Sequence, residues 1–438
     1  MKNFEEYVLE LENIAALALS GRNSKVDDLN PKQYLNGKVG TELRRRVSLD
    51  YRQRIGAFFT SEGLRTLTIS SSFLNSHDGL VWDPACGAGD LLLRVTETLP
   101  ATLDLAITLN IWGQQLCGRD IEPVFVRAAK ARLVLAAYLR GARRQPGIRL
   151  SLTKVFPLIH VGDSLVNPPS FKPTRIVLNP PFIAINQKIE QGWGAGSVSA
   201  AAVFIDKCLE IAVPDARIAA ILPDVLRTGS RYARWRAEVQ KIAEITRLHV
   251  YGAFDPQADV DVFIVELKVK SLNLEPVIGT DPWGICRTSV SATLGDYCTV
   301  AVGPVVPHRH KIAGPDLPYL HAKDAPQWGV MENIVSRRQF AGTTFQPPFV
   351  VIRRTSSPSD KFRAVGTLVA CNERVAVENH LIVCKPNDGS LASCNKIMQV
   401  LHANTTNEWL NGRIRCRHLT VDSVKDIPWV KAKNNRVT

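Results

Sequence analysis

The sequence lacks the signatures of several protein classes. Its nine cysteines form no Cys-x-x-Cys pair and their number is odd, which favours reduced thiols over a disulfide framework or a zinc site. No apolar run approaches the roughly 18 residues of a membrane-spanning helix, and the acidic, amphipathic N-terminus is unlike a signal peptide. Internal repeats and low-complexity tracts are also absent. We therefore expect a soluble, cytoplasmic protein that makes no membrane contact.

Acidic residues are scarce relative to basic ones. The 438 residues include 54 Lys and Arg against 41 Asp and Glu, a formal net charge of +13. Such a surface attracts acidic partners, with nucleic acid ahead of anionic membranes. Hydrophobic residues make up 45% and charged residues 22%, an ordinary globular balance, and the length predicts two or three domains.

Short apolar β runs alternate with helical stretches from about residue 80 to residue 270. This alternation predicts a mainly parallel sheet covered on both faces by helices. The final two runs, 248–251 and 260–268, have only a loop between them and predict an antiparallel hairpin at the sheet edge. The other expected strands are 80–82, 115–118, 158–161, 175–178 and 217–222, with helices at 89–99, 123–141, 197–212 and 230–243.

The residues outside this alternation predict two further regions. Apolar side chains recur at helical spacing over residues 3–20, and 30–55 is a second helical stretch rich in arginine. Beyond residue 270, proline-rich β-like runs precede another helical stretch at 390–412. The expected organisation is an N-terminal helical segment at 1–55, an α/β domain at 56–272 and a mixed α+β domain at 275–438.

The strongest local motif is Asp83-Pro84-Ala85-Cys86-Gly87-Ala88-Gly89, in which an apolar strand ends in an acid and a Gly-x-Gly turn enters an apolar helix. Glycines allow a tight turn and a close backbone approach to a ligand. Ligands of open α/β sheets bind beyond the carboxyl ends of the strands, where this turn lies. Taken alone, the motif is equally compatible with a strand–helix turn that binds nothing.

Two further expected strands end in acids, Asp120 and Asp163. A carboxylate at such a position can accept hydrogen bonds from ribose hydroxyls, although each acid taken singly is more often a helix cap. Three acids at successive strand ends favour a ligand. The glycines do not continue as G-x-G-x-x-G, which argues against a nicotinamide cofactor.

The Asn179-Pro180-Pro181-Phe182 motif follows the expected strand 175–178. Its two prolines cannot donate to a sheet and they stiffen the loop. The backbone carbonyls and the Asn179 side-chain oxygen thereby become fixed acceptors, which suit a planar amino group with two N–H donors. Phe182 offers a flat face to the ring that carries this group. A strand-ending turn with a packed aromatic is the alternative interpretation of the motif alone.

In this order and spacing, the motifs resemble those of the gamma-class N6-adenine DNA methyltransferases, which use S-adenosylmethionine in restriction–modification and phage-defence systems. Gly56-Ala57-Phe58-Phe59-Thr60 is similar to the family's leading motif, with Ser61 in place of the usual proline. The resemblance implies a Rossmann-like class I methyltransferase domain fused to a C-terminal target-recognition domain. It also implies a site-specific DNA-methyltransferase that modifies the N6 amino group of a flipped adenine.

The resemblance further implies how the cofactor is held. Thr60 and the backbone of the glycine turn would surround the methionine part, with Asp83 near its amino group. Asp120 would hold the ribose hydroxyls, Ile121 would pack on the cofactor's adenine, and Asp163 would accept from its exocyclic amine. The implied cofactor residues are Thr60, Asp83, Ala85, Cys86, Gly87, Gly89, Asp120, Ile121 and Asp163.

For the target base, the resemblance implies catalytic roles in the Asn179–Phe182 motif. Asn179 and the carbonyl of Pro180 would bind the amino group in the loop completed by Pro181, and Phe182 would stack on the base. Phe254 lies in a stretch similar to the loop that brings a second aromatic onto the base. A phenylalanine in the core of the hairpin is an equally good explanation of Phe254.

Residues 275–438 resemble, through loose motifs, the target-recognition domains of restriction–modification specificity modules. Their basic clusters suit phosphate or guanine contacts on double-stranded DNA, although most such clusters are solvent-exposed surface that binds nothing. A separate restriction endonuclease or defence-system partner is compatible with the resemblance and leaves no sign in the sequence. The candidate DNA-binding residues are Arg309, Lys311, Arg353, Arg354, Arg413, Arg415 and Arg417, and the basic clusters also include Lys361 and Arg363.

Two alternatives stay open. The Asn-Pro-Pro-aromatic loop also suits methylation of another amino group, on protein glutamine, RNA adenine or cytosine N4. A DNA-binding subunit of a defence complex, with weak or lost catalysis, is the alternative from another class. The His308-Arg309-His310-Lys311 cluster has no Cys or acid at ligand spacing, so we expect a basic loop and no metal.

Overall fold

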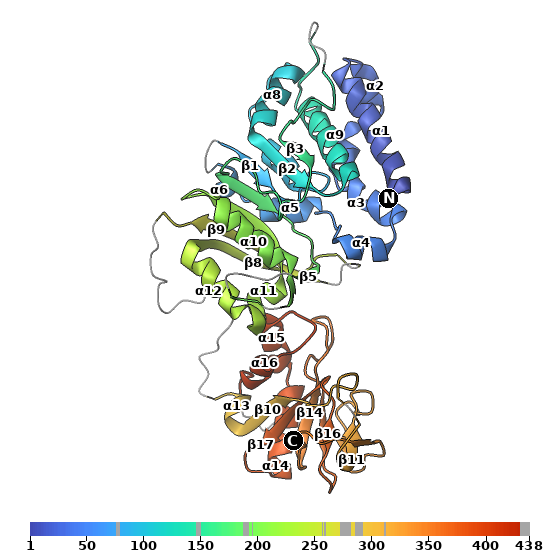
Figure 1. Cartoon of the computed structure of the whole chain (residues 1–438), viewed down its shortest axis with the longest axis vertical. Helices are drawn as coiled ribbons and strands as arrows, with labels where there is room; N and C mark the ends of the chain where they lie inside the picture. The colour runs from blue at the N-terminus through green and yellow to red at the C-terminus, as the bar shows by residue number, and fades with distance from the viewer. Residues whose placement is uncertain are drawn as a thin grey trace, which may run out of the picture. The chain divides into compact units, whose positions relative to one another are not determined.

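The computed structural model describes the chain apart from residues 76–78, 146–149, 187–191, 195, 256, 258–259, 272–281, 285–291, 311 and 430–438. The chain divides into two compact units (Figure 1). The first contains residues Met1–Leu226 and Arg231–Trp283, and the second contains Arg227–Ser230 and Gly284–Thr438.

A seven-stranded sheet organises the first unit, in the order β3-β2-β1-β4-β7-β9-β8. The first five strands of this order are parallel, and β9 pairs antiparallel with both β7 and β8. This confirms the predicted α/β fold with an antiparallel edge hairpin. The strands are β1 (Val81–Asp83), β2 (Leu116–Asp120), β3 (Ile159–Val161), β4 (Arg175–Leu178), β7 (Arg217–Pro223), β8 (Ala243–Ala253) and β9 (Asp261–Val269).

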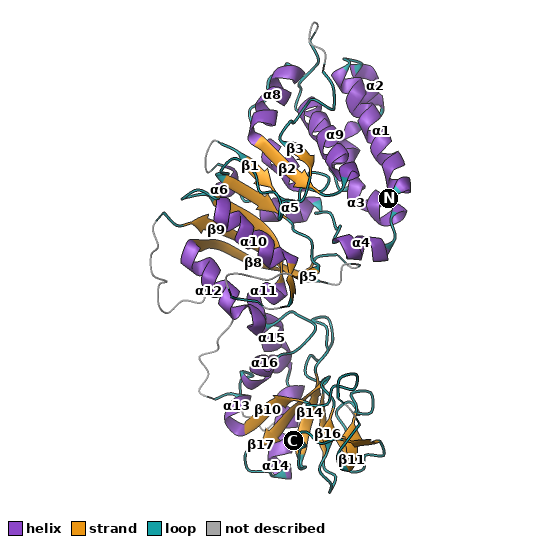
Figure 2. Cartoon of the chain, viewed as in Figure 1, coloured by secondary structure: helices purple, strands orange, loops and turns teal. Residues whose placement is uncertain are grey.

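Helices flank this sheet (Figure 2). They are α5 (Glu62–Thr68), α6 (Ser71–Leu74), α7 (Asp90–Thr96), α8 (Leu105–Gln115), α9 (Pro123–Leu139), α10 (Ala200–Ile211), α11 (Asp224–Thr228), η2 (Ser230–Tyr232) and α12 (Ala233–Ile242). Of these, α7, α9, α10 and α12 lie where the alternation predicts. Helices α5, α6, α8 and α11 differ from the expectation, which placed no element at their positions. A small antiparallel pair, β5 (Ala184–Asn186) and β6 (Ser197–Ser199), leads from the Asn179–Phe182 motif into α10.

The N-terminal helices share the core of the first unit. Phe4, Tyr7, Val8 and Leu11 of α1 (Lys2–Leu19) are buried in the same hydrophobic cluster as much of α9, and α1 runs beside α9 in Figure 1. The predicted helical stretch 30–55 divides into three helices. These are η1 (Pro31–Leu35), α3 (Lys38–Arg46) and α4 (Leu49–Ile55), after a short α2 (Asn23–Asp28).

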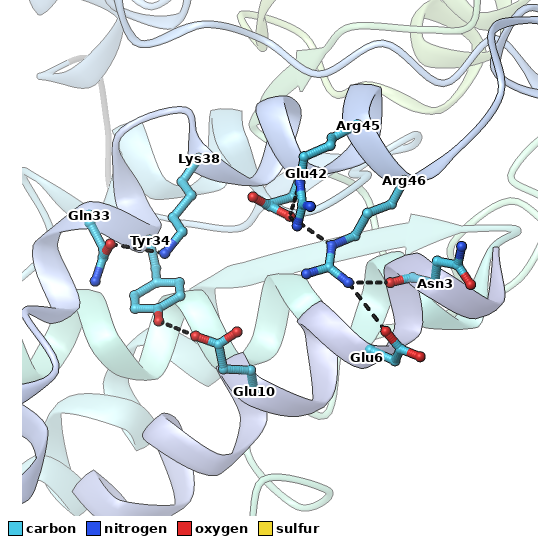
Figure 3. Close-up of polar contacts among 9 residues, drawn as sticks. All are labelled: Asn3, Glu6, Glu10, Gln33, Tyr34, Lys38, Glu42, Arg45 and Arg46. Carbon is cyan, nitrogen blue, oxygen red and sulfur yellow. Dashed lines mark hydrogen bonds and ion pairs between the residues drawn. The ribbon is translucent and has the colours of Figure 1, made fainter.

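Polar contacts join α1, η1 and α3 on their outer side (Figure 3). Arg46 donates to Glu42 at 2.7 Å and to the carbonyl of Asn3 at 2.9 Å. The hydroxyl of Tyr34 donates to Glu10 at 2.6 Å. Arginine in this stretch therefore serves, in part, to join helices of the first unit.

The second unit is a mixed α+β structure, as the sequence predicts. Its five-stranded sheet has the order β10-β17-β14-β15-β12, and a three-stranded sheet has the order β13-β11-β16. The strands are β10 (Cys298–Val302), β11 (Asp316–Leu320), β12 (Val330–Met331), β13 (Arg337–Gln339), β14 (Phe349–Arg353), β15 (Gly366–Val369), β16 (Ala376–Val377) and β17 (Leu381–Pro386). The helices are α13 (Leu294–Tyr297), α14 (Leu391–His402), α15 (Asn404–Arg413) and α16 (Val421–Lys425).

Candidate active site

A cavity of about 300 Å³ lies in the first unit, where residues that follow the parallel strands converge. Asp83, Asp120 and Asn179, at or directly after the ends of β1, β2 and β4, all line it. Gly89, Pro180, Phe182 and Phe254 are outside its lining. The sequence-predicted residues that line it are Thr60, Asp83, Ala85, Cys86, Gly87, Asp120, Ile121, Asp163, Asn179 and Pro181.

The glycine turn is held between β2 and α9. The Cys86 amide donates to the carbonyl of Arg119 at 2.9 Å, and the Gly87 amide donates to Asp120 Oδ2 at 2.9 Å. Gly89 caps α7 with φ +81°, and a Cβ there would lie 3.3 Å from the Cα of Ala129 in α9. Both the left-handed backbone and the close approach of α9 require glycine at position 89.

The three strand-end acids each accept a backbone N–H from two residues further on. Asp83 accepts from Ala85 at 3.2 Å, Asp120 from Glu122 at 2.9 Å, and Asp163 from Leu165 at 2.8 Å. Such bonds shape the turns that follow the strands. The acids therefore have a structural role whether or not a ligand is bound.

Burial changes the acidity of two of these groups. It raises the pKa of Asp120 to about 6, although the amides of Glu122 and Gly87 act in the opposite direction. It raises the pKa of Asp83 well above its ordinary range. A ligand that donates hydrogen bonds or carries positive charge would favour the ionised carboxylates.

Asn179 is held by its side-chain nitrogen. Its Nδ2 donates to the carbonyl of Phe58 at 3.2 Å and to Thr60 Oγ1 at 3.0 Å. A carbonyl can only accept, so the nitrogen faces Phe58 and the oxygen lies on the other side of the amide. That oxygen is buried and has no hydrogen-bond partner among the described residues. A buried acceptor without a donor is costly in free energy, so Asn179 has the properties of a binding group for an N–H donor.

The segment that anchors Asn179 also packs on the prolines. Gly56 has φ +68°, and a Cβ there would lie 2.4 Å from the Cβ of Pro181. Gly56 is therefore a second position where only glycine fits. Through Gly56, Phe58 and Thr60, the leading motif fixes the loop that follows β4.

Phe182 and Phe254 contact each other. Their ring centroids are 5.2 Å apart at an interplanar angle of 79°, an edge-to-face arrangement. Both rings are half-buried against Leu64, Ile221 and Val262. The predicted stacking of each ring on a base stays a prediction; the structure shows that the two rings contact each other outside the lining of the cavity.

Several cavity residues were not predicted. Phe59 lines the cavity and lies 3.1 Å from the position of a Cβ on Gly87, and its ring packs edge-on against Phe125 with centroids 4.9 Å apart. Glu122 also lines the cavity and accepts from the Tyr51 hydroxyl at 3.3 Å. Phe59 stands inside the quoted leading motif and Glu122 two residues after Asp120, so proximity to these motifs was the available signal.

The basic candidates of the second unit differ in exposure. Arg309 and Arg417 are exposed, whereas Arg353 donates to the carbonyl of Ala325 at 2.7 Å and Arg413 pairs with Asp426 at 3.2 Å. Arg354 and Arg415 are half-buried. Lys311 lies outside the described residues.

Arg363 is a correction to the sequence prediction. Its side chain is fully buried and donates to Ser356, Asn411 and the carbonyls of Ile414 and Cys416. These bonds hold the loop after α15 in place. Arg363 is therefore a structural residue and is not available for contact with DNA.

The described residues contain neither a helix long and apolar enough to cross a membrane nor a group of three or more side chains suited to a metal ion.

Comparisons with known proteins give one family and several distant structures. The family described as N-6 DNA Methylase matches residues 45–241. No curated protein matches the sequence.

Three solved structures illustrate the likeness. A Listeria monocytogenes protein described as a class I S-adenosylmethionine-dependent methyltransferase is 14% identical, with 64% of this chain and 91% of that chain covered and a TM-score of 0.37. A type I restriction–modification methyltransferase subunit from Streptococcus thermophilus is 15% identical over 53% and 50%, with a TM-score of 0.36. The type IIG restriction endonuclease BpuSI is 14% identical over 92% and 62%, with a TM-score of 0.47. The match thus spans half of the Streptococcus subunit and less than two thirds of BpuSI.

Proposed function

We propose that this chain is a site-specific DNA-methyltransferase of the gamma class, because the family described as N-6 DNA Methylase matches residues 45–241. It transfers a methyl group from S-adenosylmethionine to the N6 amino group of adenine, in the cytoplasm, as part of a restriction–modification or phage-defence system. A restriction endonuclease or other defence protein is its expected partner.

The residues that line the cavity offer hydrogen-bond acceptors that suit the hydroxyl and amino groups of the cofactor. Asp120 offers carboxylate oxygens to the ribose hydroxyls, and Asp163 accepts from the exocyclic amine of the cofactor's adenine, beside Ile121. Asp83 and the glycine turn face the methionine part, near Thr60. Gly87 and Phe59 both line the cavity, and a Cβ on Gly87 would lie 3.1 Å from the Phe59 ring, so a side chain at position 87 would narrow the space available to the ligand. When bound, the cofactor supplies an electrophilic methyl group on a sulfonium.

Asn179 binds the amino group that receives the methyl group. The amino nitrogen of adenine is a poor nucleophile because its lone pair is delocalised into the ring. Asn179 Oδ1 and the carbonyl of Pro180, aimed at the two amino hydrogens, favour a more pyramidal nitrogen and hold it in line with the methyl group. Positioning and electrostatics of this kind supply much of a rate enhancement, so the reaction needs no general base.

Access to this site requires an extruded base. A base inside a duplex cannot reach a buried acceptor, and flipping costs a few kcal/mol of stacking. Stacking on an aromatic ring returns about 1–3 kcal/mol per base, which is the role of Phe182 and Phe254. The second unit would hold the duplex, with Arg309 and Arg417 as the exposed candidates for phosphate contact.

The single observation that carries the proposal is the unpartnered Asn179 oxygen in the cavity that the strand-end acids and the glycine turn also line. A purely structural loop would satisfy this oxygen internally. An acceptor left for an amino donor, beside carboxylates suited to a nucleoside, is the arrangement that adenine methylation needs.

The experiment is methyl transfer with tritiated S-adenosylmethionine and mixed-sequence DNA, followed by digestion to nucleosides. We expect the label in N6-methyl-2′-deoxyadenosine. Label in N4-methylcytosine, in RNA or only in protein would replace the proposal with one of the other amino acceptors. No label on any substrate would favour a DNA-binding subunit without catalysis. Sequencing of methylated bases in DNA from cells that express the protein then gives the recognition site.

A further inference from the structure

Helices α3 and α4 hold the residues that follow Phe254. Arg44 of α3 lies 3.1 Å from Asp255 Oδ2. Arg52 of α4 donates through Nη2 to Gln257 Oε1 at 2.7 Å, and Gln53 Nε2 donates to the Gln257 carbonyl at 3.4 Å. The Gln257 amide in turn donates to Asp255 Oδ1 at 2.8 Å. Three side chains from one short stretch therefore fix the chain next to Phe254.

The same stretch continues into the residues that hold the Asn179–Phe182 motif. Gly56 ends α4 and packs on Pro181, and the carbonyl of Phe58 accepts from Asn179. Residues 52–60 thus contact both parts of the proposed base site, which are far apart in the sequence. Phe182 directly follows one anchored residue, Pro181, and Phe254 directly precedes the other, Asp255, and the centroids of these two rings are 5.2 Å apart.

Burial of the charged Arg52 side chain is unfavourable in free energy, which argues against a purely structural role. Its side chain is buried and donates to neutral acceptors, the carbonyl of Val47 at 3.2 Å and Gln257, while its guanidinium lies 5.5 Å from the centroid of the Phe58 ring. The charge of Asp255 attracts the guanidinium without a direct hydrogen bond between the two in the described contacts. Burial of a charge is unfavourable unless its donors are satisfied, and a packed apolar side chain often stabilises such a site equally well. Stability is therefore a weak explanation for this arginine.

We propose that Arg52 is a positioning residue for the target base. It holds the chain after Phe254 so that this ring stays beside Phe182, and an extruded purine meets an aromatic surface that is already ordered. The inference rests on the proposed function, because only a base that leaves the duplex needs such a surface.

The test uses variants that distinguish loss of the contacts to the loop after Phe254 from a general loss of stability. The double variant Asp255→Ala/Gln257→Ala removes the loop side of the contacts and leaves Arg52 in place, and Arg52→Lys keeps the charge but loses the forked geometry. Arg45→Ala is the matched control, because Arg45 lies on α3, is exposed and pairs only with Glu42 among the described contacts.

On DNA that carries the identified site, we expect kcat/KM for DNA to fall about tenfold in the double variant, within the range for loss of one stacked base. Arg52→Lys should lie between the double variant and the wild type, and Arg45→Ala should match the wild type. Cofactor affinity should change less than about twofold in all three. An unchanged kcat/KM in the double variant would overturn the proposal.

A Phe254→Ala background supplies the decisive comparison. If the contacts act through Phe254, the double variant should cause no further loss there. An equal tenfold loss in that background would show that these residues act on DNA directly, and would overturn the positioning role. If the wild-type protein methylates no DNA, the proposed function fails, and hydrogen exchange decides the contact separately. Amides at 252–255 should exchange faster in the double variant, and unchanged exchange would contradict it.

Discussion

The two ends of the cavity are built in opposite ways. At the glycine-turn end, Asp83, Asp120 and Asp163 already accept hydrogen bonds from the protein's own backbone. At the other end, the nitrogen of Asn179 is bound and its oxygen has no partner among the described residues. The first end thus keeps its shape without a ligand, whereas the second holds an acceptor in readiness for one. We assign the first to the cofactor and the second to the target amino group.

The largest expected effect at the glycine-turn end comes from Asp120→Ala. The change removes charge-assisted bonds to the ribose and a partner of the Gly87 amide, and bonds to a charged group contribute about 1.5–3 kcal/mol. We expect S-adenosylmethionine affinity, measured by calorimetry, to fall about 100-fold. Phe182→Ala, in the Asn179–Phe182 motif but outside the lining of the cavity, should leave that affinity unchanged. Equal loss in both variants would erase the distinction between the two ends.

Gly56→Ala tests the Asn179 end. The new Cβ would displace Pro181 and occupy a left-handed backbone position, so turnover on DNA should fall about tenfold and the free energy of unfolding by about 1–2 kcal/mol. Cofactor affinity should stay within about threefold of the wild type. The control is Gly63→Ala in α5, where a Cβ meets nothing within 4 Å and the helix favours alanine. Loss of cofactor binding with turnover preserved would reverse the assignment.

The smallest effect is a pH dependence of cofactor binding. Burial raises the pKa of Asp120 to about 6, and the ribose hydroxyls need the ionised acceptor. The affinity for S-adenosylmethionine is therefore highest well above pH 6, where Asp120 is ionised. It falls as the pH decreases through this value, by about fourfold between pH 7 and 5.5. Calorimetry across this range should show the decrease, and Asp120→Asn should lose that part of the slope. An identical slope in the variant would assign the titration to another group, such as Asp83.

Much of the fold was predictable because buried apolar strands and helical spacing are local signals. Helix α8 was missed although its signals are local too: Asp104 caps it, and Leu105, Leu109 and Trp112 are buried at helical spacing. The division of the stretch 30–55 follows from Gly37, at φ +79°, and from the Ser48 cap of α4. Strand β8 begins at Ala243, directly where α12 ends, and is longer than the apolar run at 248–251 indicates.

The motifs that line the cavity could be predicted from the sequence, but the residues that hold these motifs in place could not. Asn179 directly follows its strand and is predicted from that local motif, whereas its anchor at Phe58 lies 121 residues away and the Arg52 contact spans 205 residues. Such pairings depend on how strands and helices pack, which no local pattern specifies. Arg363 was predicted to be a surface residue for a similar reason: the sequence shows that the residue is charged but does not show that its side chain is buried.

The most direct test of the account compares wild type with Asn179→Ala, measuring cofactor affinity and DNA methylation on the same preparations. We expect S-adenosylmethionine affinity within about threefold of the wild type, and transfer of tritium to adenine lower by at least about 100-fold, the typical cost of one preorganised hydrogen-bond partner in a transition state. Methylation at near wild-type rates in the variant would contradict the central claim that the Asn179 oxygen binds the amino group that is methylated.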